Sequence, residues 1–165
     1  MPKLLHLISL ALAFWLGLCC QQLVPEAQAG DLKRVTGVSG IFFKSRDPAA
    51  LKKWYSRHLG LNMDQYGTNF VWRTVDGRRA QTQWSAFAAN TTYFEPSSAS
   101  FMINYRVADL ESLIPILKSE GVTLVDQLDV QSYGKFLHIL DPEGNKIELF
   151  EPTGEYPEGD QGRTY

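Results

Sequence analysis

The chain has 165 residues, with 16 Lys and Arg against 18 Asp and Glu, so its formal charge at pH 7 is −2. A near-neutral balance without a block of basic residues argues against a nucleic-acid partner and against an anionic membrane surface. Both cysteines, Cys19 and Cys20, lie near the N-terminus. Thiol catalysis, thiolate metal sites and disulfides are therefore excluded for the chain that follows them.

The first 29 residues have the pattern of a secretory signal peptide. A lysine precedes an apolar stretch over residues 4–18, and the small residues Ala27 and Ala29 predict cleavage before Gly30. The apolar stretch is shorter than the roughly 20 residues of a membrane-spanning helix. We therefore expect an exported protein, periplasmic or extracellular, with no membrane contact after cleavage. A lipid anchor at the cysteines and an uncleaved membrane anchor are the alternatives.

The predicted domain, residues 30–152, contains two halves that repeat one order of elements, about 35–88 and about 100–151. In the first half, a strand leads to Asp47-Pro48, which is a helix N-cap followed by proline, and Gly60 ends the helix. Three strand-like runs follow this helix. The strands of the first half are predicted over about 36–45, 62–66, 69–75 and 79–87.

The second half repeats this order. Asp109 is the predicted N-cap of its helix, which ends before Gly121. The turn Asp141-Pro-Glu-Gly-Asn145 joins the last two strands into a hairpin. The strands are predicted over about 101–107, 123–130, 135–140 and 146–150. Residues 89–99 are interpreted as the linker between the halves, and residues 153–165 as a mobile tail.

The final hairpin brings an acid and a histidine together. Pairing across the turn places His138 opposite Glu148, and the period of two residues puts Glu148 on the same face as Phe150. An acid among large apolar residues is either a buried ligand or base, or one end of a solvated edge strand. The His138–Glu148 pair can transfer a proton, bind a metal weakly, or serve as a structural cross-strand pair.

Each half is thus a predicted βαβββ module, and the fold class is α+β. One module leaves a face of its sheet uncovered, so two modules should pair into curved sheets that enclose a cleft, the default site for a small molecule. The sequence over about Val35 to Pro152 resembles the vicinal oxygen chelate superfamily, which includes glyoxalase I, extradiol dioxygenases and bleomycin resistance proteins. The resemblance rests on the runs at Gly40–Pro48, Asn104–Leu110, Asp141–Asn145 and Ile147–Leu149.

This resemblance also implies positions for metal ligands. Metal-dependent members carry a histidine seven residues before the aspartate that starts each helix, and an acid on the last strand of each half. The histidine positions correspond to Gly40 and Met102, and the acid positions to Gln81 or Gln83 and to Glu148. Only Glu148 matches, which is too few ligands for a tight site. A bound divalent metal is therefore doubtful, with Glu148 as its one matching ligand.

The predicted cleft has further candidate lining residues, namely Trp84, Gln83, Asn104 and Tyr133. As plain alternatives, Asn104 could satisfy a backbone group, and Trp84 and Tyr133 could be core or rim aromatic residues. The first hypothesis is an exported module that binds a small organic molecule. The alternative is a lyase, isomerase or dioxygenase of the vicinal oxygen chelate type that uses Glu148 and His138 as catalytic residues. A dimeric structural protein with a vestigial cleft is the third hypothesis, and a homodimer is compatible with each.

Overall fold

The computed structural model describes residues 34–154 of the chain. The predicted signal peptide and residues 155–165 of the predicted tail lie outside the described residues, so export and the domain boundaries remain predictions. Among residues 34–154, no helix is both long enough and apolar enough to cross a membrane.

The first half forms β1 (Val35–Ser45), α2 (Pro48–Leu59), β2 (Thr68–Arg73) and β3 (Arg79–Ala88). Asp47 caps α2 as predicted, because its side chain accepts a hydrogen bond from the backbone of Ala50 at 2.9 Å. The strand predicted over residues 62–66 does not form. Instead, the Asp64 carboxylate accepts the backbone N–H groups of Tyr66 and Gly67, which closes a turn in that segment.

The second half forms β4 (Phe101–Val107), α3 (Leu110–Ser119), β5 (Thr123–Leu124), β6 (Asp129–Gln131), β7 (Gly134–Leu140) and β8 (Lys146–Pro152). The strand predicted over residues 123–130 is interrupted between β5 and β6. The Asp126 carboxylate accepts a hydrogen bond from the backbone N–H of His138 at 2.9 Å. A side chain therefore binds this donor in place of the backbone of a neighbouring strand. The predicted hairpin forms with the predicted register, and His138 lies opposite Glu148.

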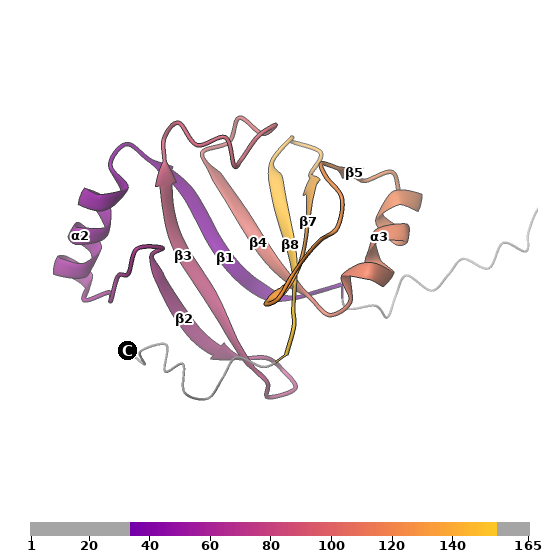
Figure 1. Cartoon of the computed structure of the whole chain (residues 1–165), viewed down its shortest axis with the longest axis horizontal. Coiled ribbons are helices and arrows are strands. Elements are labelled where there is room, and N and C mark those ends of the chain that lie inside the picture. The colour runs from indigo at the N-terminus through magenta and orange to yellow at the C-terminus, as the bar shows by residue number, and fades with distance from the viewer. Residues whose placement is uncertain (1–33, 155–165) are drawn as a thin grey trace, which may run out of the picture. The chain divides into compact units, whose positions relative to one another are not determined.

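The two modules join edge to edge in one curved, unclosed sheet of eight strands (Figure 1). The strand order is β2-β3-β1-β4-β8-β7-β5, with β6 paired to β7. β1 and β4 pair antiparallel at the junction, while β1 pairs parallel with β3 and β4 pairs parallel with β8. The second module thus repeats the pairing of the first, and the predicted α+β fold class is confirmed.

The register separates the two faces of the sheet. Opposed residues on neighbouring strands share a face, so one transverse row is made of Trp84, Ile41, Ile103, Ile147 and Ile139. Ile139 and Ile147 belong to the apolar core that packs on α3, so this row lies on the face that carries the helices. The adjacent row, formed by a neighbouring residue on each strand, must therefore lie on the opposite face of the sheet.

Candidate functional site

The adjacent row crosses the middle of the sheet and contains the candidate polar residues. It runs from Gln83 on β3 through Gly40 on β1, Asn104 on β4 and Glu148 on β8 to His138 on β7. Residues far apart in the sequence are thereby brought onto one face by strand pairing alone. The row has one acid and one histidine, and both come from the second module.

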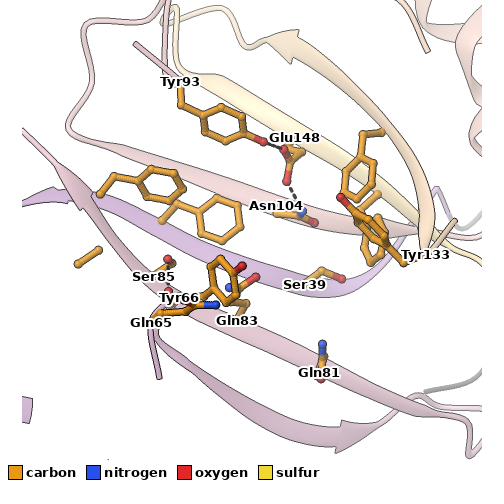
Figure 2. A pocket seen from close by; sticks show the side chains of 15 residues that line it. Ser39, Gln65, Tyr66, Gln81, Gln83, Ser85, Tyr93, Asn104, Tyr133 and Glu148 are labelled. Atoms are coloured by element: carbon orange, nitrogen blue, oxygen red, sulfur yellow. Dashed lines mark hydrogen bonds between the residues drawn. The ribbon is translucent and has the colours of Figure 1, made fainter. Parts of the chain in front are cut away.

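A cavity of about 580 Å³ lies over this row, on the face away from the helices (Figure 2). Seven of its fifteen lining residues are aromatic, and they come from both modules and from the linker: Phe42, Tyr66, Phe87, Tyr93, Tyr133, Phe136 and Phe150. The remaining lining residues are Ser39, Gln65, Gln81, Gln83, Ser85, Ala86, Asn104 and Glu148. The cavity is therefore largely aromatic, with amides, two hydroxyls and one carboxylate.

Glu148 is only 3% exposed, and its carboxylate is held from three sides. The Asn104 amide donates to Oε1 and the Tyr93 hydroxyl donates to Oε2 (Figure 2). The His138 Nε2 lies 2.9 Å from the same Oε2. A buried carboxylate requires such partners, because desolvation of an unpaired charge costs several kcal/mol.

His138 bridges two carboxylates. Its Nδ1 lies 2.5 Å from Asp126 Oδ2, while its Nε2 contacts Glu148. Burial and the charge of Lys146 lower the pKa of the imidazole, but the hydrogen bond and charge of Glu148 and the hydrogen bond of Asp126 outweigh them, so the pKa of His138 is raised overall. The charged imidazolium can donate to both carboxylates at once, which the neutral ring cannot do.

The linker between the modules carries Tyr93 into this network. Its neighbour Phe94 is fully buried against Phe42 and Met102, which anchors the segment at the sheet. The Lys146 ammonium donates to the Tyr93 backbone oxygen at 2.7 Å. Burial, followed by the charge of Glu148, raises the pKa of the Tyr93 hydroxyl, so that it remains a protonated donor.

Tyr93 and Asp126 were not among the site residues predicted from the sequence. The adjacent aromatic residues Tyr93 and Phe94 in an otherwise polar linker are a signal that could have indicated an anchored segment. Asp126 gave no such signal, because it was placed within a predicted strand.

The predicted lining residues have different positions. Gln83 and Asn104 lie in the row beneath the cavity, and Tyr133, which is 64% exposed, lies at its edge beside Phe136. Trp84 does not line the cavity. It belongs to the helix-side row, where its ring packs on Tyr55 with centroids 4.7 Å apart, because adjacent residues of a strand point to opposite faces.

The row does not fit a divalent metal. The register places Asn104, rather than Met102, at the position that corresponds to Gly40, and Met102 is fully buried in an apolar cluster. A Cβ atom on Gly40 would lie 2.5 Å from Phe42 Cζ, so a phenyl ring occupies the space of a ligand side chain there. Both ring nitrogens of His138 already face carboxylates. Within residues 34–154, no group of three or more His, Cys, Asp and Glu could hold a metal ion.

Two polar atoms beneath the cavity lack partners. Asn104 Oδ1 and Ser39 Oγ are buried and accept or donate no hydrogen bond among the described residues. Asn104 and Ser39 are 4% and 8% exposed, and both line the cavity. Unsatisfied buried polar atoms are rare in native proteins and commonly mark a place for a ligand or a water molecule.

Comparison with known proteins identifies the fold. A family model described as Glyoxalase/Bleomycin resistance protein/Dioxygenase superfamily matches residues 41–149. The solved structure of methylmalonyl-CoA epimerase from Mycobacterium tuberculosis is 25% identical, and the match covers 73% of this chain and 90% of that chain with a TM-score of 0.50. A variant of the Streptomyces coelicolor epimerase in complex with 2-nitronate-propionyl-CoA is 15% identical, with 73% and 99% covered and a TM-score of 0.54. No curated protein matches the sequence.

Proposed function

Because the chain belongs to the glyoxalase/bleomycin resistance protein/dioxygenase superfamily, we propose that it binds a small, largely apolar organic molecule in the cavity, without a metal. The carrying observation is the cavity of about 580 Å³, in which seven aromatic side chains surround one buried carboxylate. Small-molecule sites typically have volumes of roughly 300–1,000 Å³, apolar walls and a few fixed polar groups. The open volume also counts against a vestigial cleft filled by side chains.

A ligand screen with a matched pair of variants tests this proposal. Gln83 faces the cavity from its row, so Gln83→Trp should fill part of the volume. Gln127 is exposed in the loop between β5 and β6, so Gln127→Trp adds the same side chain outside the cavity. In a thermal-shift screen of aromatic fragments, we expect hits that stabilise the wild type and Gln127→Trp but not Gln83→Trp. Hits that bind all three proteins equally would contradict the proposed site.

A second candidate function is proton transfer, as in a lyase or isomerase. The chain of contacts from Asp126 through His138 to Glu148 favours it, because it connects a partly exposed carboxylate to an ionisable group at the cavity. Tyr93, Asn104 and His138 already contact the two oxygen atoms of Glu148, however, which favours binding as the first candidate. NMR in D₂O can follow the exchange of protons for deuterium at carbon atoms beside a carbonyl group, for any fragment that binds. This measurement separates proton transfer from binding alone. Exchange that Glu148→Gln abolishes would make the protein an enzyme.

The ligands of the epimerase structures are not the ligands that we propose. The Streptomyces coelicolor epimerase variant holds 2-nitronate-propionyl-CoA, and a CoA ester carries several phosphate charges. None of the fifteen described residues that line the cavity is Lys or Arg. The cavity therefore offers no cation to an anionic group, and we do not extend the epimerase reaction to this chain.

We propose that the protein acts after export, as the N-terminal pattern predicts. The mass of the intact protein, recovered from the exported fraction of an expression host, should correspond to a chain that begins at Gly30. A mass that retains the first 29 residues, or that includes a lipid, would contradict the predicted cleavage.

A further inference from the structure

The geometry of the cavity points to a class of ligand, and we propose that it selects an organic cation, specifically a protonated amine on an aromatic or apolar body. This inference rests on the proposed function, because it concerns the same cavity. Three independent features support it: the charge of the lining, the arrangement of aromatic rings, and the unpartnered oxygen atoms beneath the cavity.

Glu148 is the one residue with a formal charge among the described residues that line the cavity. The imidazole of His138 does not cancel this charge, because it also faces the carboxylate of Asp126. The ammonium group of Lys146 is bound to the backbone oxygen of Tyr93 and does not line the cavity. Glu148 therefore presents the one charged group of the described cavity lining, at a buried position where water screens it weakly.

The aromatic walls suit a cation as well as an apolar body. Phe87 stacks on Tyr93 with centroids 5.5 Å apart, and Phe136 stacks on Phe150 with centroids 4.7 Å apart. All four rings line the cavity, and the Tyr93 ring already has a cation over it, because the Lys146 ammonium lies 5.1 Å from its centroid. The face of an aromatic ring carries partial negative charge and attracts a cation placed over it, and rings around a cavity form the usual recognition site for organic ammonium groups.

The two unpartnered polar atoms add acceptors. Asn104 Oδ1 can only accept a hydrogen bond, and Ser39 Oγ has lone pairs that can accept one. Ser39 precedes Gly40, which lies opposite Asn104 on the neighbouring strand, so both residues come from the β1–β4 junction. A protonated amine has several N–H donors and no acceptor, so its hydrogen-bonding groups match the acceptor character of these atoms and of the carboxylate.

Three probes of similar size and different charge test this inference. We expect 3-phenylpropylamine to bind the wild type roughly 10-fold more tightly than 3-phenylpropan-1-ol, and 3-phenylpropionate to bind most weakly, in NMR titrations at neutral pH. Glu148→Gln should remove the preference for the amine over the alcohol. Glu143→Gln removes the same charge from the exposed turn between β7 and β8 and should keep the preference.

The outcomes distinguish the inference from the proposed function. If the alcohol or the propionate binds as tightly as the amine, or if only neutral or anionic fragments bind the cavity, the cation inference is overturned and the binding function stands. If neither the probes nor any aromatic fragment binds, both fail. Should Glu148→Gln not fold, the order of the three probes on the wild type decides the question by itself.

Discussion

The two modules share one backbone plan but hold different chemistry. At corresponding positions of the central row, the first module has Gly40 and Gln83, whereas the second has Asn104 and Glu148. The first module thus provides space and neutral amides, and the second provides the charge with its hydrogen-bond partners. A duplicated fold therefore allows one copy to present neutral groups while the other holds a buried acid.

The helices differ in the same way. α3 buries Leu110, Leu113 and Leu117 in the largest apolar core, whereas no residue of α2 is buried. Both helices begin with an aspartate N-cap, so their starts are equivalent and the difference lies in what each helix covers. The second module should therefore contribute most of the stability of the domain.

The largest effect should come from equivalent truncations in the two helices. Leu113 is 3% exposed, so Leu113→Ala should lower the free energy of unfolding by about 3 kcal/mol. Leu51 on α2 is only partly buried, and Leu51→Ala should cost less than about 1 kcal/mol. Urea denaturation measures both values. Equal losses would contradict the unequal roles of the modules.

A smaller effect should come from adding a side chain at Gly40, the position of the central row in the first module that has none. In Gly40→Ala the new methyl group would meet the ring of Phe42, so the ring must turn, at a cost of about 1–2 kcal/mol. In a Phe42→Leu background the same substitution should cost much less, because the ring is absent. A double-mutant cycle by urea denaturation measures this coupling, and additive costs would show that Phe42 does not occupy the space.

The smallest effect should be a dependence on pH that arises in the second module. Burial and the charge of Lys146 lower the folded pKa of His138, but the hydrogen bond and charge of Glu148 and the hydrogen bond of Asp126 outweigh them and raise it overall. Its contribution to stability is therefore fully present below the unfolded pKa of about 6.5 and is lost as the pH rises through the folded pKa. The urea concentration at the midpoint of unfolding should therefore fall in the wild type as the pH rises from about 6.5 through the folded pKa. It should not fall over this pH range in His138→Gln.

An NMR titration of the same histidine checks the cause. Asp126→Asn removes one of the two carboxylates that face the ring and should lower the pKa of His138. A pKa that is unchanged in this variant, or a wild-type pKa below about 6.5, would contradict the assigned network.

The sequence predicted the pair at the centre of the site because local rules determine it. The turn at residues 141–145 sets the register of the last hairpin, and the register places His138 opposite Glu148. The caps Asp47 and Asp109 likewise fixed the starts of both helices.

The remaining site residues depend on tertiary packing, which local patterns do not contain. Tyr93 reaches Glu148 because Phe94 is buried and Lys146 binds the linker backbone. Asp126 reaches His138 because its carboxylate takes the place of a strand hydrogen bond. Trp84 was expected in the cleft since it follows Gln83, but the alternation of the strand places it on the other face.

We infer that this row of residues binds an organic molecule directly and does not fit a divalent metal. The most direct measurement is the metal content of the purified protein by plasma mass spectrometry, after incubation with zinc, nickel, manganese and iron and removal of the free ions. We expect far less than one ion per chain, with no difference between the wild type and Glu148→Gln. A stoichiometric ion that is lost in Glu148→Gln would contradict it and would establish a metal site at the acid of the second module.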